Sequence, residues 1–219
     1  MTHRLLLLRH GEVASHRGDV AVTGRGLDGA EHVGQRLAAT AGRIRVLTGG
    51  TLRARQTGAA IATGASAAGA AVDEPRVAFA LRNPDLYVAG ERVDMVSSAA
   101  ALAEQVPGMT VDEAAAVPFF AGFFEQPDRI GWWLRLAADV PGDDAEAVAR
   151  RIGHFAASLP DRTPQPAELT VGITHSPVLR ACALAHLGHD PGEPEWLTGL
   201  ELSVSSDRSV AVCWYAATN

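Results

Sequence analysis

Three short polar segments of the chain carry side chains suited to binding and transferring a phosphoryl group. They are Arg-His-Gly-Glu at residues 9–12, Arg-Ala-Arg-Gln-Thr at residues 53–57 and Thr-His-Ser-Pro at residues 174–177. Arginine pairs with two phosphate oxygens at once through its planar guanidinium group and keeps its proton in proteins. A neutral imidazole can act as a nucleophile and divide a difficult transfer into two steps through a covalent intermediate. Together, the three segments indicate phosphoryl-transfer chemistry.

The backbone and the composition of the chain favour the same kind of site. Gly11 lets the backbone come close to an anion, and a helix that begins near Ser176 directs its free N–H groups toward it. The nineteen basic residues are all arginine. An anion site in this chain must therefore be built from Arg, His and backbone N–H groups.

Strand and helix patterns alternate along most of the chain, which is typical of a parallel sheet covered by helices. The predicted strands are residues 5–8, 44–48, 77–81, 169–174, 200–205 and 210–214. The predicted helices are residues 23–41, 52–62, 143–159 and 177–188. We therefore expect a three-layer α/β/α sandwich with a mostly parallel sheet. Each polar segment follows one of the strands, so the three should converge on one cleft at the carboxyl ends of the strands.

The middle of the chain differs, because residues 83–143 predict helices but no strand. We interpret residues 1–219 as one domain in which residues 83–158 form an inserted helical cap. Six aromatic residues lie between Phe119 and Trp133. They form either a hydrophobic core that joins the cap to the sheet, or a lid or oligomer contact. If the cap lines the cleft, the substrate should have an apolar portion besides its phosphate.

Composition and charge exclude several classes of partner. The net charge of −6 and the absence of a basic run argue against nucleic acid. The four leucines at residues 5–8 are too few to cross a bilayer and no signal peptide follows, so we expect a cytoplasmic protein without a membrane partner. The two cysteines fit neither a disulfide framework nor a metal pattern, and we expect two buried free thiols. We expect no metal and no cofactor.

Four stretches of the sequence resemble a known family. The stretches LLLLRHGE, VTGRGLDGAEHVGQRLA, TLRARQTGAAIA and GITHSPVLRA are similar to segments of the histidine phosphatase superfamily, the phosphoglycerate mutase-like phosphatases. The likeness covers about the first eighty and the last fifty-five residues, and not the cap. It implies a phosphohistidine at His10, with the phosphate bound by Arg9, Arg53 and His175. The helix N-terminus at Ser176 is the further phosphate-binding candidate. Arg55 is the alternative to Arg53, but the Arg-Ala-x-Gln-Thr spacing favours Arg53.

The chain departs from the family at the expected proton donor. Relatives often have Leu-Arg-Glu after the third strand, where the Glu protonates the leaving group, whereas this chain has Asn83 in that place. An amide cannot donate and recover a proton in this way. Asp85 is the candidate acid, followed by Glu91 and Asp94. The alternative for Asp85 is a structural turn residue, because Asn-Pro-Asp is typical turn chemistry.

These observations predict hydrolysis of a small-molecule phosphomonoester through a phosphohistidine on His10. Two alternatives stay open. One is a phosphoglycerate mutase that returns the phosphoryl group to its substrate, and the other is a phosphate-ligand binding protein that has lost catalysis. A homodimer is one option for the oligomeric state.

Overall fold

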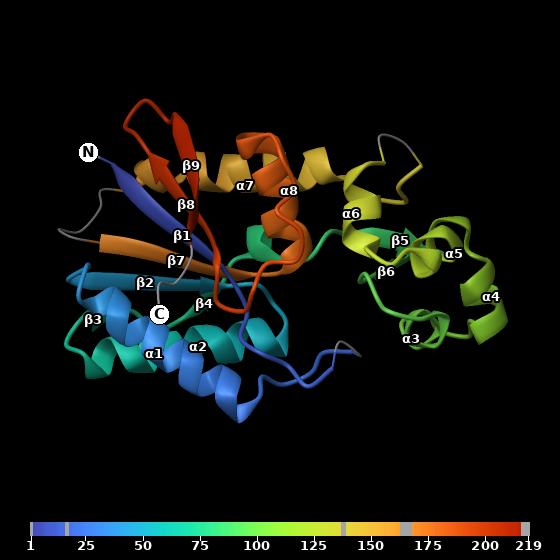
Figure 1. Ribbon diagram of the computed structural model, residues 1–219, viewed down its shortest axis with the longest axis horizontal. Helices are drawn as coiled ribbons and strands as arrows, with labels where there is room; N and C mark the ends of the chain where they lie inside the picture. Colours follow the sequence, from blue (N-terminus) through green and yellow to red (C-terminus); the bar gives the residue numbers. More distant parts are fainter. Residues whose placement is uncertain (1, 16–17, 137–138, 163–167, 216–219) are drawn as a thin grey trace.

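A seven-stranded, mostly parallel sheet forms the centre of the molecule, as predicted (Figure 1). The computed structural model describes residues 2–15, 18–136, 139–162 and 168–215. The strand order is β3-β2-β7-β1-β8-β9, and β4 also pairs with β2. Strands β1, β2, β3, β4 and β7 are parallel to one another. Strand β8 pairs antiparallel with both β1 and β9. The strands are β1 (His3–Arg9), β2 (Arg43–Thr48), β3 (Ala71–Val72), β4 (Arg76–Val77), β7 (Glu168–Thr174), β8 (Gly199–Val204) and β9 (Val210–Tyr215).

Helices cover both faces of this sheet and give the expected three layers (Figure 1). Helices α1 (Gly24–Ala38) and α2 (Leu52–Ala67) lie on one face, and α7 (Ala145–Ala157) and α8 (Ser176–Leu187) lie on the other. The leucines of β1 alternate between two hydrophobic cores: Leu5 and Leu7 face α7 and α8, whereas Leu6 and Leu8 face α1 and α2. A strand buried on both faces therefore has a continuous apolar sequence.

Helices α1 and α2 pack against each other at two glycines. A Cβ atom at Gly34 would lie 2.1 Å from the carbonyl oxygen of Ile61, and one at Gly64 would lie 2.0 Å from the carbonyl oxygen of Glu31. No side chain larger than hydrogen fits at such distances, so the two backbones are in direct contact. This contact holds α2, whose first turn carries the second polar segment, in a fixed place.

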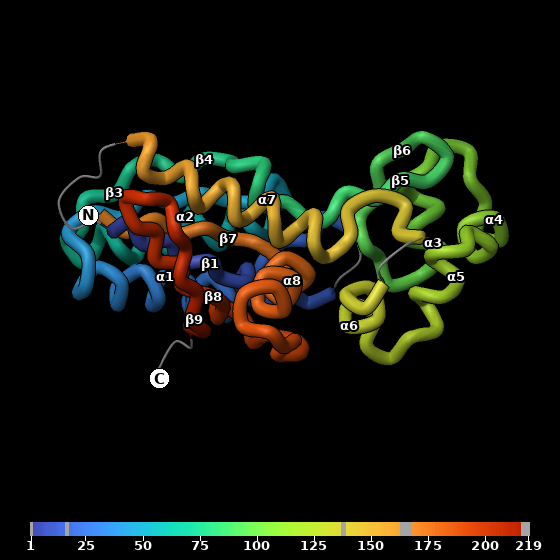
Figure 2. Tube along the Cα trace, turned by 90° about the horizontal axis from the view of Figure 1, so that it is seen from above, coloured from blue at the N-terminus to red at the C-terminus, as the bar shows by residue number. Residues whose placement is uncertain are grey.

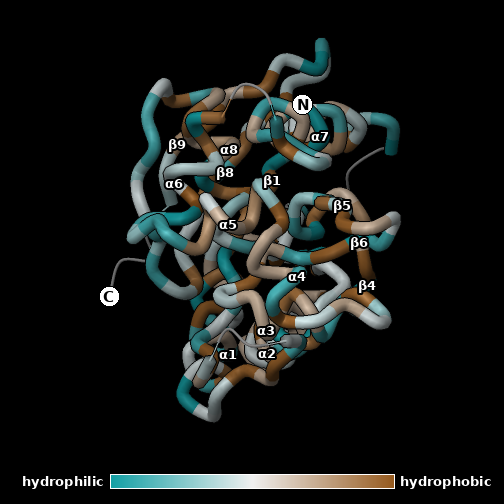
Figure 3. Tube along the Cα trace, turned by 90° about the vertical axis from the view of Figure 1, so that its right-hand side faces the viewer, coloured by the Kyte–Doolittle hydropathy of each residue, from teal (hydrophilic) through white to brown (hydrophobic). Residues whose placement is uncertain are grey.

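The inserted segment stands beyond the end of the sheet (Figure 2) and is in front when the molecule is viewed from that end (Figure 3). It contains a hairpin, β5 (Leu86–Val88) and β6 (Glu91–Val93), and four short helices. The helices are α3 (Ala99–Ala103), α4 (Val111–Ala116), α5 (Pro118–Glu125) and α6 (Arg129–Leu134). Phe119, Phe120, Phe123 and Trp133 are buried in the core that also contains Leu5. The aromatic cluster is therefore part of the hydrophobic core.

Two expectations about secondary structure were wrong. The hairpin of β5 and β6 was not predicted, because its strands have three residues each and its turn uses Ala89, whose φ of 51° is unusual for a residue with a side chain. A strand was expected at residues 77–81, but only Arg76–Val77 pairs with β2, and Phe79–Leu81 forms a 3-10 turn, η1. Val77 and Phe79 are exposed, so this apolar run is not buried as a strand would be.

Two further expectations concern α7 and the cysteines. Helix α7 lies within the range expected for the cap, yet it packs against α8 over the sheet, followed by a 3-10 turn, η2 (Leu159–Asp161). Cys182 is buried as expected, whereas Cys213 is exposed on the edge strand β9, where side chains alternate between core and solvent.

In the part of the chain that the structure describes, no helix combines the length and the apolar character needed to cross a membrane.

The glycine contact between α1 and α2 can be tested with a matched pair of substitutions. Gly64→Ala should destabilise the protein by about 1–3 kcal/mol, because the added methyl group forces the two helices apart. Gly153→Ala, in the interior of α7 where a Cβ atom meets open space, should stabilise by about 0.5–1 kcal/mol. Urea unfolding measures both values. A Gly64→Ala protein as stable as the unsubstituted one would contradict the close contact.

Candidate active site

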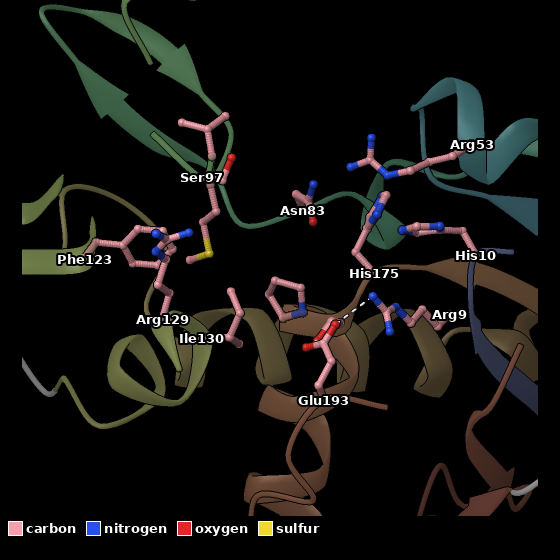
Figure 4. Close-up of a pocket in the computed structure, with 14 residues that line it drawn as sticks. Arg9, His10, Arg53, Asn83, Ser97, Phe123, Arg129, Ile130, His175 and Glu193 are labelled. Atoms are coloured by element: carbon pink, nitrogen blue, oxygen red, sulfur yellow. Dashed lines mark hydrogen bonds and ion pairs between the residues drawn. The ribbon is translucent and has the colours of Figure 1, made fainter. Parts of the chain in front are cut away.

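The three polar segments come together at one edge of the sheet. Strand β7 pairs in parallel with both β1 and β2, so that Arg9 lies opposite Thr174 and Thr48 lies opposite Ile173. The residues that follow these strands therefore lie side by side, as expected for a sheet of this type. A pocket of about 230 Å³ opens at this edge (Figure 4). It is lined by Arg9, His10, Arg53, Asn83, Met95, Val96, Ser97, Phe123, Arg129, Ile130, His175, Ser176, Pro177 and Glu193.

His10 and His175 lie next to each other in this pocket. Their ring centroids are 5.3 Å apart and the rings are tilted by 59°. The Nδ1 atom of His10 lies 2.9 Å from the carbonyl oxygen of Gly11, which can only accept a hydrogen bond. Nδ1 therefore carries the proton, and the lone pair of the neutral ring is on Nε2. This tautomer presents a nucleophilic nitrogen at the end of the ring.

The backbone next to His10 is tied to α2. The N–H group of Gly11 donates to the hydroxyl oxygen of Thr57 over 2.9 Å, and that hydroxyl group donates to the carbonyl oxygen of Arg53 over 2.7 Å. A Cβ atom at Gly11 would lie 3.0 Å from the carbonyl oxygen of Gly26, so the glycine also allows the first turn of α1 to come close. These hydrogen bonds and this close contact fix the first and second polar segments relative to each other.

Arg9 is held by the loop that precedes β8. Its guanidinium carbon lies 3.5 Å from the ring centroid of Trp196, and its amino groups contact the carbonyl oxygen of Pro194 at 2.5 Å and the carboxylate of Glu193 at 2.7 Å. Burial lowers the pKa of Arg9, the nearby Glu193 raises it, and the charge of Arg53 lowers it again. The side chain thus stays a fixed cation at the pocket wall.

Of the two arginines in the second segment, Arg53 lines the pocket and Arg55 does not. Arg53 is largely buried, and its nearest acidic group, Asp19, is 3.8 Å away. Burial is the main cause that lowers the pKa of Arg53. Arg55 is exposed and donates to the carbonyl oxygen of Gly50. The spacing argument therefore selected the arginine that reaches the pocket.

His175 is buried and surrounded by positive charge. Its pKa is held well below the usual range for histidine, first by burial and then by the charges of Arg53, His10 and Arg9. The ring is consequently neutral at pH 7. Its Nδ1 atom is buried and has no hydrogen-bond partner among the described residues, whereas Nε2 lies 3.5 Å from the hydroxyl oxygen of Thr51. An anion that enters the pocket offers this buried ring a hydrogen-bond acceptor.

Ser176 and Glu193 also line the pocket, and Figure 4 shows Glu193 beside Arg9. Ser176 is the first residue of α8, and its hydroxyl group donates to the Glu193 carboxylate over 2.5 Å. The second carboxylate oxygen of Glu193 accepts from Arg9. Glu193 is therefore a carboxylate in direct contact with two of the residues predicted to bind phosphate.

The candidate acid Asp85 lies elsewhere. Its carboxylate is bound by Arg82 and Arg92, and these two arginines, outweighing the opposing effect of burial, lower its pKa to about 2. Asp85 does not line the pocket. These contacts fit a structural turn residue, the alternative that the sequence left open for Asp85. A carboxyl group with a pKa of about 2 is ionised at neutral pH and is therefore a poor proton donor. Glu91 and Asp94 also lie outside the pocket lining.

Sequence reasoning missed Glu193, Trp196 and the cap side of the pocket. Glu193 and Trp196 belong to a connection between α8 and β8 that carries no periodic pattern. Its only signal is a tryptophan within a polar Pro-containing stretch, which does not say what the loop contacts. The cap residues Met95, Phe123 and Arg129 are separated by many residues, and only the packing of the cap brings them to the pocket.

The pocket has the chemistry of an anion site. Its charged and titratable lining consists of three arginines, two histidines and a single carboxylate, Glu193. Within the described ranges, no group of three His, Cys, Asp or Glu side chains could hold a metal ion. The wall formed by the cap is apolar except for Asn83, Ser97 and Arg129. The site can thus bind a phosphoryl group at one end and a less polar group at the other.

Solved structures resemble this chain along nearly its whole length. A mycobacterial glucosyl-3-phosphoglycerate phosphatase is 20% identical, with 98% of this chain and 97% of that chain covered and a TM-score of 0.58. YhfR of Bacillus stearothermophilus is 20% identical over 99% of this chain and 96% of that chain, with a TM-score of 0.58. A phosphoglycerate mutase of Bacillus anthracis is 13% identical over 97% and 92%, with a TM-score of 0.57.

The sequence comparisons give no further assignment, because no protein-family model and no curated protein matches the chain. The structural likeness concerns the cap as well as the sheet, since the alignments extend over almost all of both chains. The chain therefore has the fold of the histidine phosphatases and phosphoglycerate mutase-like proteins.

Proposed function

We propose that this protein hydrolyses phosphomonoesters through a phosphohistidine on His10. The observation that carries the proposal is the pocket in which the rings of His10 and His175 lie 5.3 Å apart, with Arg9 and Arg53 in its wall. Several fixed cations around one nucleophilic nitrogen suit the charge on the oxygens of a transferring phosphoryl group. The solved structures of similar fold include enzymes named as phosphatases, which supports the same chemistry.

In the first step, Nε2 of His10 attacks phosphorus as the bond between phosphorus and the leaving oxygen breaks. Nδ1 keeps its proton and donates it in a hydrogen bond to the carbonyl oxygen of Gly11, which holds the ring in place while the ring gains positive charge. Arg9 and Arg53 bind the phosphoryl oxygens, and His175 donates one hydrogen bond to them. In the second step, water attacks phosphorus, and the bond between phosphorus and nitrogen breaks.

Glu193 is the residue we propose as proton donor in place of Asp85. The protonated form of a carboxyl group carries one O–H donor, which can serve a leaving oxygen. Glu193 would then give this proton to the leaving oxygen in the first step. Its carboxylate would take a proton from the attacking water in the second step. The link to Ser176 and Arg9 places it against the phosphate-binding residues.

The cytoplasmic location, the small phosphate ester as partner and the homodimer stay predictions.

Incubation with 2- or 3-phosphoglycerate separates hydrolysis from mutase activity, because a mutase produces the other isomer whereas a phosphatase releases free phosphate. Release of phosphate is the expected result.

The nucleophile is tested first. His10→Ala should lower the rate of aryl phosphate hydrolysis on the order of 10⁴-fold or more, because the covalent route is lost. Brief incubation of the unsubstituted protein with labelled substrate, followed by alkaline quench and mass spectrometry, should place a phosphoryl group on His10. His186→Ala, an exposed histidine of α8 outside the pocket, is the control and should be unaffected. Substantial activity in His10→Ala would exclude this mechanism, and no turnover by any form would favour a binding protein.

The role of Glu193 is tested with leaving groups of different basicity. Glu193→Gln should lower kcat for alkyl phosphates about 10²–10⁴-fold, since alkoxides need a proton as they leave. Aryl phosphates should be affected much less.

Glu195→Gln is the matched control, because Glu195 is an exposed carboxylate of the same loop outside the pocket. It should retain the rates of the unsubstituted protein. An equal loss for alkyl and aryl esters in Glu193→Gln would mean that Glu193 only holds Arg9, and the donor would have to be sought elsewhere.

A further inference from the structure

The cap side of the pocket contains an arginine that no acidic group of the described residues neutralises. Arg129 lines the pocket next to Phe123 and across from His10, Arg9 and Arg53 (Figure 4). Among the described residues it makes no ion pair, and its single side-chain hydrogen bond goes from one amino group to the carbonyl oxygen of Phe124 over 3.3 Å. Its Nε atom is buried and has no hydrogen-bond partner in this part of the chain.

The acidic residue beside Arg129 is already engaged. Both oxygens of Asp128 accept hydrogen bonds from Arg180, at 2.8 and 2.7 Å. Arg180 is 1% exposed and is also bound by Asp190. The cap is thereby fastened to α8 directly next to Arg129, so Arg129 stands at a defined place in the pocket wall. Glu193, the carboxylate of the pocket, is bound by Arg9 and Ser176.

The surroundings of Arg129 are apolar. Met95, Val96, Phe123 and Ile130 line the same part of the pocket. A guanidinium group next to such side chains attracts an anion more strongly than one in open water, because fewer water molecules screen its charge. Its planar N–H groups also match a carboxylate or a phosphate with two parallel hydrogen bonds.

We infer that Arg129 binds a second anionic group of the substrate, at the opposite end from the phosphate that His10 attacks. The substrate class is therefore a phosphomonoester with an apolar middle portion and a distal carboxylate or second phosphate. The inference rests on the proposed function for the end at which the phosphoryl group reacts. It adds a specificity-determining residue that the sequence motifs do not contain.

Binding measurements test this inference without requiring turnover. The probes are ω-carboxyalkyl phosphonates of increasing chain length, which cannot be hydrolysed, and n-alkyl phosphonates of the same lengths. Isothermal titration calorimetry should show that at the best length the carboxylate tightens binding to the unsubstituted protein roughly tenfold to a hundredfold, as expected for hydrogen bonds to charged groups. A parallel series with a second phosphonate shows which of the two anions is preferred.

Arg129→Met keeps the apolar stem of the side chain and should bring the affinity ratio of carboxylate to alkyl probe close to one. Arg135→Met, an exposed arginine of the same segment outside the pocket, is the control and should keep the full ratio. Equal affinity of the unsubstituted protein for both probes at every length would overturn the inference, as would an unchanged ratio in Arg129→Met.

These experiments distinguish failure of the second anion site from failure of the proposed function. If aryl phosphates are hydrolysed but the carboxylate gives no advantage, only the second anion site is wrong. If no ester is hydrolysed but the carboxylate preference exists and depends on Arg129, the anion site stands and the catalytic proposal fails.

Discussion

The structure depends on holding several cations close together at one point. Arg9 and Arg53 line one small pocket together with two histidines, and the charges of the two guanidinium groups repel each other. The effect is visible in His175, whose pKa is lowered by burial and by the positive charge around it. Such a cluster persists only because the surrounding fold determines each position, and it becomes more stable when an anion enters. Repulsion between the positive charges of the pocket therefore favours the entry of an anion.

Two features of the fold supply this constraint. The parallel ladder of β1, β7 and β2 sets the strand ends side by side, and the loop before β8 holds Arg9 from three sides through Trp196, Pro194 and Glu193. The aromatic face and the carboxylate compensate for the burial of the guanidinium group. In the proposed mechanism, Glu193 combines two tasks, because it stabilises the Arg9 cation in the free protein and gives a proton to the leaving oxygen.

Arginine also connects the cap to the sandwich. Arg180 joins Asp128 of the cap to Asp190, at the start of the loop that holds Arg9. Arg151 of α7 binds Asp143 and the carbonyl oxygen of Arg82. Lysine, a compact point charge, could not bridge two partners with the same geometry. The two walls of the pocket are consequently linked through buried or half-buried guanidinium groups rather than through the apolar core alone.

The sequence by itself determined the sheet, its covering helices and the convergence of His10, Arg53 and His175. These follow from local rules, because a buried parallel strand has a continuous apolar sequence and the residue after it lies at the ligand-binding edge. Only the tertiary structure decided which carboxylate lines the pocket and which residues form the cap wall. The side chains of Asp85, Glu193 and Arg129 belong to turns and loops, where the partner of a charge depends on packing between distant segments. In the folded protein, Asp85 pairs with two arginines and Glu193 lines the pocket. Arg129 has no acidic partner among the described residues.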